Sequence, residues 1–187
     1  MYSFFLFLYI YIYYITIMKN LSEFILEAKP NELGINGNVN EIIDKLKEAF
    51  AEEMNAWYQY YIIAPFLVGN ERTNIAADYK ENGKEELKHA NMLLERINEL
   101  NGTFTDIDTP DSWNKIAPHK FILQESPDVA VSVGLMADAE RGAIETYTAL
   151  EKLTRGKDVV TNKMIKGILA DEQKPLQEML EFLEDIK

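Results

Sequence analysis

The chain has 187 residues, a net charge of −12 at neutral pH and no cysteine. This length suffices for one domain with a substantial core, and the absence of cysteine excludes disulfides, zinc–thiolate sites, iron–sulfur clusters and thiol nucleophiles. The acidic balance favours cations as partners and makes nucleic acid an unexpected one. The sequence has only two histidines, His89 and His119, and no Gly-x-Ser-x-Gly, P-loop or Gly-x-Gly-x-x-Gly motif.

Residues 1–17 differ in composition from the rest of the chain, because they carry no charge and eight of them are Tyr or Phe. Seventeen residues is the lower limit for a membrane span, and tyrosine is unusual in the middle of one. We therefore expect Met18 to be the working start of the protein, with a membrane anchor at residues 1–17 as the alternative. A lead-in segment follows at residues 18–37, and the folded domain is expected at residues 38–187.

The first long helix is predicted to start at Asn38, which has Glu41 three residues later as in a capping box. Apolar residues then recur at steps of three and four as far as Ala64. Pro65 is expected to kink the last turn, and Gly69-Asn70 to end the helix. The second helix is predicted to start after residues 72–74 and to end at Asn101-Gly102.

Residues 103–125 show no convincing helical pattern, and a connection of this length is unusual within a compact domain. The third helix is predicted to start at Ser126-Pro127-Asp128, with Ser126 as the cap, and to close at Gly156. Asp158 is expected to cap the fourth helix. The pattern predicts an all-α fold, an antiparallel four-helix bundle with a long crossover between helices 2 and 3.

Polar side chains interrupt the apolar face of each predicted helix near its middle. They are the four acids and one imidazole Glu53, Glu86, His89, Glu140 and Glu172. Four buried carboxylates repel one another and are costly to desolvate, whereas two divalent cations would balance their charge. The alternative is that some of these acids lean out to solvent between the helices.

Three segments resemble those of a known family. Glu53-Met54-Asn55-Ala56-Trp57-Tyr58-Gln59-Tyr60 and Glu86-Leu87-Lys88-His89-Ala90 are similar to the ligand segments of bacterioferritins, and Ala139-Glu140-Arg141-Gly142-Ala143 is similar to the third helix of Dps-like ferritins. The resemblance covers about residues 38–186 and implies a ferritin-like bundle that binds two iron ions per chain, with manganese as an alternative metal. It also implies that the protein assembles into a homo-oligomeric shell, with a dodecamer favoured, and works in the cytoplasm.

The resemblance also implies a role for each ligand. Glu53 and His89 would be terminal ligands of one iron, Glu86 and Glu172 would bridge both irons, and Glu140 would be terminal on the other. The family's fourth helix supplies a second Glu-x-x-His, but here Glu172 is followed three residues later by Pro175. We therefore expect an asymmetric centre whose second position is weak. His119 shows no spacing that would make it a substitute, and Gly142 stands where other Dps-like proteins carry one cysteine of a pair.

Several functions remain open at this point. The first is oxidation of Fe(II) by O2 or H2O2, for iron storage, detoxification or protection from oxidative stress. The second is a structural or shell-forming subunit with an incomplete metal site, and the third is a rubrerythrin-like peroxidase that uses an external electron donor. Tyr60, Tyr79 and Tyr147 lie on or beside the inner faces, either as core residues or as donors to the ligands.

Overall fold

The computed structural model describes residues 34–120, 124 and 126–186, and Asn36–Lys187 form one compact unit. The elements of this unit are α2 (Val39–Ile63), the short 3-10 helix η2 (Ala64–Phe66), α3 (Arg72–Glu99), α4 (Pro110–Ile116), α5 (Val129–Thr154) and α6 (Val159–Asp185). No strand occurs in the described residues beyond one isolated bridge between Val68 and Asp128, which agrees with the all-α prediction. None of the described helices is long and apolar enough to cross a membrane. The predicted segment 1–17 and most of the lead-in lie outside the described residues, so their roles remain predictions.

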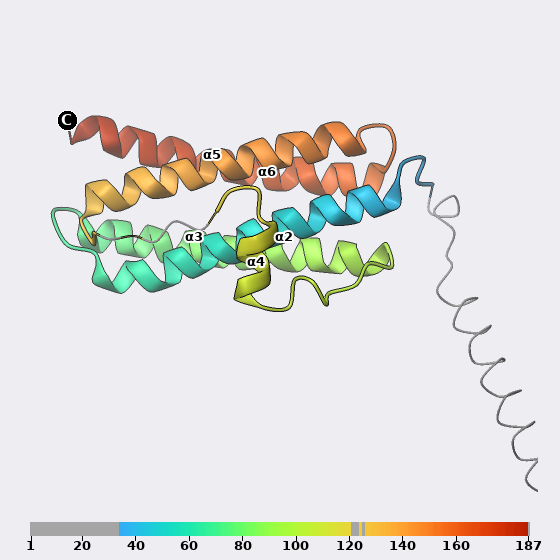
Figure 1. Ribbon diagram of the computed structural model, residues 1–187. Coiled ribbons are helices and arrows are strands. Elements are labelled where there is room, and N and C mark those ends of the chain that lie inside the picture. Colours follow the sequence, from blue (N-terminus) through green and yellow to red (C-terminus); the bar gives the residue numbers. More distant parts are fainter. Residues whose placement is uncertain (1–33, 121–123, 125, 187) are drawn as a thin grey trace, which may run out of the picture. The chain divides into compact units, whose positions relative to one another are not determined.

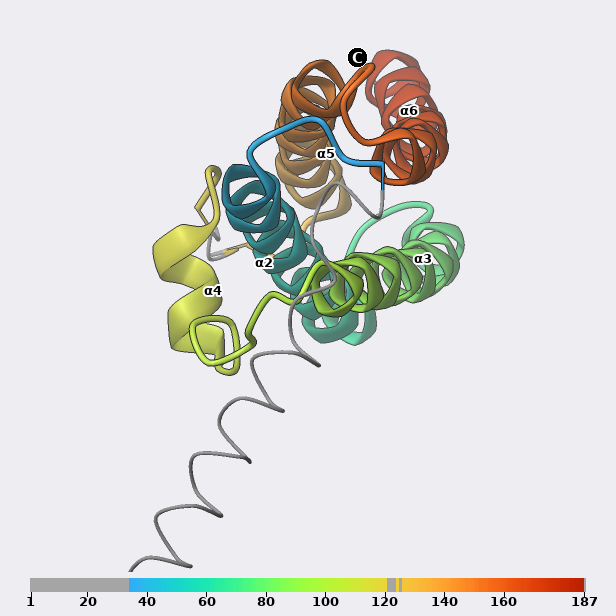
Figure 2. The same cartoon turned by 90° about the vertical axis from the view of Figure 1, so that its right-hand side faces the viewer.

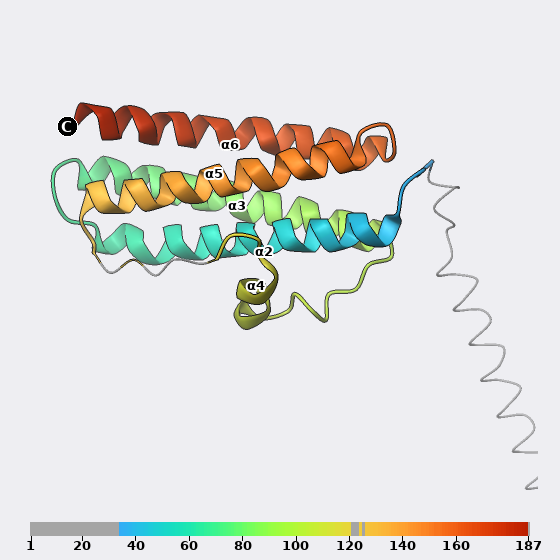
Figure 3. The ribbon, with the colours of Figure 1, turned by 45° about the horizontal axis from the view of Figure 1, so that its top comes forward.

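The four long helices form a bundle, with α2 packed along α3 and α5 packed along α6 (Figure 1). Seen along its length, the bundle places α4 outside the four helices, against α2 (Figure 2). The chain leaves α3 at one end of the bundle and returns to the other end before α5 begins (Figure 3). The segment between α3 and α5 is therefore the predicted crossover between the second and third long helices, which lets α5 run parallel to α3.

Two of the four long helices, α2 and α6, begin at the capping residues that the sequence predicted. The side chain of Asn38 accepts a hydrogen bond from the backbone N–H of Glu41, and Asp158 accepts one from Thr161. Two predicted starts were wrong, that of α3 by three residues and that of α5 by two. Helix α3 begins at Arg72 because Glu71 adopts the left-handed conformation that turns the chain just before it. Helix α5 begins at Val129 because Asp128, rather than Ser126, caps the free N–H groups of Ala130 and Val131.

The crossover contains a helix that the sequence pattern did not predict. Helix α4 starts with a capping box between Thr109 and Ser112 and has Pro110 in its first turn. The ring of Trp113 meets that of Phe50 edge to face, with centroids 6.4 Å apart. A helix of two turns has too few residues to show a periodic pattern, so its caps are the only local signal.

Two prolines affect the helices differently. Pro65 ends α2 instead of kinking it, because the chain tightens into η2 at Ala64. Pro175 lies inside α6, which continues as one helix to Asp185. Since proline has no backbone N–H, α6 lacks the hydrogen bond that residue 175 would otherwise donate to Asp171.

A buried polar network holds the start of α6 against α3. The Arg96 guanidinium donates to both carboxylate oxygens of Asp158, at 3.0 and 2.9 Å, and its Nε donates to Thr161 at 2.7 Å. Burial alone would raise the pKa of Asp158, but hydrogen bonds from Thr161 and the charge of Arg96 lower it below its usual value. The cap of α6 is therefore also half of a buried ion pair.

Candidate metal centre

Five polar side chains meet in the middle of the bundle, and each is buried. Helix α2 supplies Glu53, α3 supplies Glu86 and His89, α5 supplies Glu140 and α6 supplies Glu172, all 2–4 % exposed. The alternative, in which some of these acids turn out to solvent, is wrong for this set. Each acid interrupts an otherwise apolar helix face, so packing that face into the core carries the acid inward.

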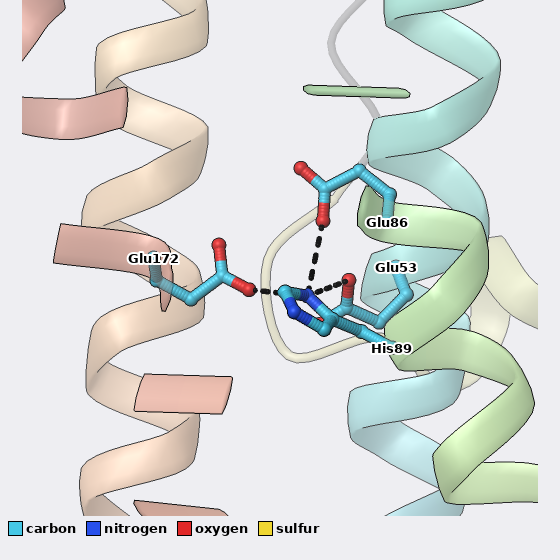
Figure 4. A group of neighbouring side chains, drawn as sticks. All are labelled: Glu53, Glu86, His89 and Glu172. Carbon is cyan, nitrogen blue, oxygen red and sulfur yellow. Dashed lines mark ion pairs between the residues drawn. The ribbon is translucent and has the colours of Figure 1, made fainter. Parts of the chain in front are cut away.

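The imidazole of His89 lies at the centre of one group of four side chains (Figure 4). Its Nδ1 is 2.8 Å from Oε1 of Glu172, 3.6 Å from Oε2 of Glu53 and 3.8 Å from Oε2 of Glu86. One ligand atom from each of these four residues lies within 4.8 Å of the others. Ligand atoms at this spacing can surround one cation.

Glu140, from α5, borders the same space. It lines a cavity of about 450 Å³ together with Glu53 and Glu86. Its Oε1 accepts a hydrogen bond from the hydroxyl of Tyr60, and the Tyr147 hydroxyl donates to Glu53. Burial raises the pKa of both tyrosines, so both hydroxyls stay protonated as donors. The third tyrosine, Tyr79, pairs instead with Ser132, 2.8 Å away.

Several polar atoms at this centre make no hydrogen bond with any described residue. They are Oε2 of Glu53, Nδ1 of His89, Oε2 of Glu140 and Oε1 of Glu172. Nδ1 of His89 and Oε1 of Glu172 form an ion pair at 2.8 Å but do not meet the geometry of a hydrogen bond. A buried polar atom without a partner is costly, so a set of them in one place indicates a missing partner. Because three of the four are carboxylate oxygens and the fourth is an imidazole nitrogen, a divalent cation fits them.

Burial and mutual repulsion shift the titration of the centre. Burial raises the pKa of Glu86 and of Glu140 well above the usual value, and repulsion from Glu172 adds to both shifts. Burial also raises the pKa of Glu172, with repulsion from Glu53 adding to it. Burial alone would lower the pKa of His89, but the carboxylates of Glu172, Glu53 and Glu86 raise it to about 12. The metal-free centre therefore retains protons at neutral pH, and a cation that binds there has to displace them.

The second nitrogen of His89 points to a residue that the sequence reasoning missed. Its Nε2 lies 3.4 Å from Oδ2 of Asp171, a half-exposed carboxylate. A metal-binding histidine commonly donates its other N–H to a carboxylate, which fixes the ring and its tautomer. The only sequence signal was that Asp171 directly precedes Glu172.

Neither Pro175 nor His119 brings a second imidazole to the centre. Pro175 is half-buried and lines a small pocket with Tyr79 and Asn82. His119 lies at the outer end of the cavity, where its ring packs on Gly142. Among the described residues, the centre thus has one imidazole and four carboxylates.

Gly83 explains how α2 and α3 approach each other beside the centre. A Cβ at this position would lie 3.3 Å from Cβ of Tyr60. Glycine lowers helix propensity, but here its missing side chain allows the close approach of the two helices that carry Glu53 and Glu86.

Comparison with known proteins identifies the fold. The family model for the ferritin-like domain matches residues 43–187. The DNA protection during starvation protein of Pyrococcus furiosus is 27% identical over 135 residues, which cover 72% of each chain. The bacterioferritin of Desulfovibrio desulfuricans is 28% identical over 136 residues, covering 71% of this chain and 69% of that one.

A solved structure agrees with these sequence relatives. It is a dodecameric thioferritin from Bacteroides fragilis, described as bacterioferritin-related. It is 31% identical, covers 83% of this chain and 94% of its own, and superposes with a TM-score of 0.79. The family match over most of the chain and these relatives lead to one conclusion: the chain belongs to the ferritin-like family, among the Dps-like and bacterioferritin-type ferritins.

Proposed function

We propose that the protein binds Fe(II) at the centre formed by Glu53, Glu86, His89, Glu140 and Glu172, and oxidises it with O2 or H2O2. Iron is the substrate in this reaction, and manganese is a competing ion of similar ligand preference. The reaction would serve iron storage, detoxification or protection from oxidative stress. In the peroxide reaction, two Fe(II) each lose one electron, the O–O bond breaks, and two protons are consumed to give two waters.

One observation carries this proposal. Polar atoms from all four long helices converge at one buried place, and four of them make no hydrogen bond with the described residues, although two of the four, Nδ1 of His89 and Oε1 of Glu172, face each other as an ion pair at 2.8 Å. A structural network would satisfy these atoms internally, because unsatisfied buried groups are destabilising. The arrangement is instead stable when cations supply the missing partners.

The surrounding residues determine how a bound ion is held. His89 presents Nδ1 to the centre while Asp171 faces its other nitrogen. Tyr60 and Tyr147 each donate a hydroxyl to one ligand, Glu140 and Glu53 respectively, which restricts how these carboxylates rotate. The cavity beside Glu53, Glu86 and Glu140 gives small oxidants space to reach the site.

We expect the two metal positions to differ in affinity. The position beside Glu53, Glu86, His89 and Glu172 has four ligands within 4.8 Å of one another. The other has Glu140 and shared carboxylates, since Pro175 occupies the place of a second imidazole. The second candidate function, a shell subunit without oxidation chemistry, rests on this same missing ligand.

Assembly into a homo-oligomeric shell is part of the proposal. The Bacteroides fragilis thioferritin, at 31% identity, is described as dodecameric, and we propose the same number here. Its subunit contacts would cover exposed apolar side chains such as Tyr61 and Phe66, which are 67% and 66% exposed. The absence of cysteine suits the reducing cytoplasm, where we propose that the protein works.

The test is an anaerobic Fe(II) titration of the metal-free protein. We expect one tight site and one weaker site per chain, with the tight site lost in Glu86→Gln. The matched control is Glu81→Gln, because Glu81 lies on the same helix but is exposed and paired with Lys84. Addition of H2O2 or O2 to the loaded protein should then give Fe(III) faster than in Glu86→Gln. Binding without oxidation would favour the shell subunit, and no binding would refute the metal centre.

A further inference from the structure

The cavity beside the centre connects it to a second group of polar side chains. Its inner end is lined by Glu53, Glu86 and Glu140, and its lining also includes Glu52 and His119. The His119 side chain is 45% exposed, whereas the three inner carboxylates are buried. The cavity thus leads from a surface histidine to the buried ligands.

His119 is held in place by Glu52. Oε1 of Glu52 accepts a hydrogen bond from the backbone N–H of His119 at 3.0 Å and lies 2.6 Å from its Nδ1. The Glu52 side chain is only 9% exposed. A carboxylate this close to Nδ1 favours the tautomer with its proton on that nitrogen, in which Nε2 is the atom available to a metal ion.

The free nitrogen faces another carboxylate. Nε2 of His119 lies 3.6 Å from Oε2 of Glu145, which is 76% exposed. A cation held about 2.1 Å from each atom fits between two ligands at this spacing, with an angle of about 120° at the ion. Gly142 makes this position of the ring accessible, because a Cβ there would lie 2.8 Å from Cγ of His119.

Two further observations indicate a cation here. Glu52 lines the same cavity, and its Oε2 is buried without a well-formed hydrogen bond to the described residues, although the Thr146 side chain lies near enough to offset part of the rise that burial causes in the pKa of Glu52. Two basic side chains that neighbour His119 and Gly142 in the sequence are occupied elsewhere. Lys120 donates to the backbone oxygens of residues 114, 115 and 117, and Arg141 pairs with Asp138.

We propose that Nε2 of His119 and the carboxylate of Glu145 form a capture site for divalent cations, which Glu52 orients, at the outer end of the cavity. An ion released from this site meets Oε2 of Glu52 and then the buried carboxylates. Capture of a cation stands on these residues alone, and only delivery of Fe(II) from this site to the centre rests on the proposed function.

The two histidines make this site measurable by chemical protection. Diethyl pyrocarbonate modifies accessible neutral imidazoles, so it should modify His119 and leave the buried His89 unreacted. Zn(II) is the probe because it binds imidazole and carboxylate and has no redox chemistry. We expect saturating Zn(II), at ten times its dissociation constant, to slow modification of His119 about tenfold, measured by peptide mass spectrometry. An unchanged rate would overturn the proposal.

Variants separate this site from the buried centre. Glu145→Gln should abolish most of the protection, whereas the control Glu48→Gln should retain it, since Glu48 lies one turn before Glu52 and pairs with Lys45. Glu86→Gln, which lacks the buried centre, should retain full protection even if the proposed function fails. Protection that survives in Glu145→Gln, or disappears in Glu86→Gln, would overturn the capture site.

Delivery of Fe(II) from the capture site to the buried centre is tested separately, by oxidation kinetics. In Glu145→Gln we expect the Fe(II) concentration for half-maximal oxidation to rise several-fold, while the maximal rate stays that of the unmodified protein. Gly142→Ala should give the same change with every ligand still present, because the added methyl displaces the His119 ring. An unchanged half-maximal concentration in both variants would overturn the delivery role.

Discussion

Nδ1 of His89 lies 2.8 Å from Oε1 of Glu172, and this contact joins the middle of α3 to the middle of α6. The next residue back along α6, Asp171, faces the other nitrogen of the same ring at 3.4 Å. Two consecutive residues of α6 therefore contact both nitrogens of one imidazole. The orientation of His89 depends on α6 as much as on its own helix.

Replacing Asp171 by Asn should weaken metal binding without removing a ligand. The variant loses the carboxylate that favours the proton on Nε2, and loss of such a partner commonly lowers metal affinity 10- to 100-fold, which is about 1.4–2.7 kcal/mol. The measurement is the anaerobic Fe(II) dissociation constant of the tight site. Glu178→Gln is a suitable control because Glu178 is exposed on the same helix and pairs with Lys174. Equal affinities in the two variants would contradict the role of Asp171.

The substitution Glu86→Gln should have opposite effects on the metal-free and the metal-bound protein. Glu86 is buried, and burial together with repulsion from Glu172 raises its pKa. Neutral Gln removes the cost of taking up a proton at this position on folding at neutral pH, so the free energy of unfolding of the metal-free chain should rise by about 1–4 kcal/mol. The stabilisation that Fe(II) or Mn(II) adds should fall in the same variant.

Thermal or denaturant unfolding with and without metal measures both effects. The exposed Glu81→Gln variant should change stability by less than about 0.5 kcal/mol in either state. A metal-free Glu86→Gln protein that is less stable than the original would show that the carboxylate is structural.

The sequence predicted the fold and the buried acids because both depend on the same periodic signal. A repeat of three and four residues defines the inner face, and Glu53, Glu86, Glu140 and Glu172 fall on it. The pattern could not show Asp171 or Glu52, since each lies beside a ligand on a face that looks exposed. Their roles depend on which neighbouring segment packs there, and a period along one helix carries no information about that.

The position of His119 beside Glu52 could not be predicted from the spacing of residues in the sequence. It lies in the crossover, 67 residues from Glu52, and the contact arises because the chain returns along α2 before α5 begins. Long-range contacts made by an irregular segment leave no local pattern. The short helix α4 escaped prediction for a related reason, because its seven residues span only two turns.

The substitution Pro175→His should strengthen the second metal position. It recreates at Glu172 the three-residue spacing of Glu86 and His89, so both side chains project from one side of α6. We expect the anaerobic titration to show two tight Fe(II) sites per chain instead of one.

Pro175→Ala separates this effect from repair of the helix. Alanine restores the backbone N–H that can bond to Asp171, so it should raise stability while the number of tight sites stays at one. Two tight sites in Pro175→Ala would mean that the shape of α6, and not a missing ligand, limits the second position.

The pair of Arg96 and Asp158 should make stability depend on acidic pH. The pKa of Asp158 is lower in the folded protein than in the unfolded chain, where it is about 3.9. Its stabilising contribution is therefore complete above the unfolded pKa and is lost as the pH falls through the folded value. In Asp158→Asn this part of the acid dependence should disappear.

At neutral pH the same substitution should cost about 3–5 kcal/mol, because Asp158 is the buried counter-charge of Arg96 and the remaining partner, Glu99, is exposed. Asparagine can still cap α6, so loss of the cap does not account for the change. The exposed pair of Lys84 and Glu81 provides the comparison, since Lys84→Ala should cost less than about 1 kcal/mol. Urea unfolding across a pH series measures both variants.

The buried carboxylates of the centre also bear on the stability of the metal-free bundle. An apolar substitution at one of the four buried carboxylates relieves repulsion and removes a desolvation cost, so the metal-free bundle would gain stability from it. Stability of the metal-free chain alone would then favour an apolar interior at residues 53, 86, 140 and 172. All five polar groups are present in this chain. A chain that carries these carboxylates therefore depends on a bound ion to offset what they cost the folded state.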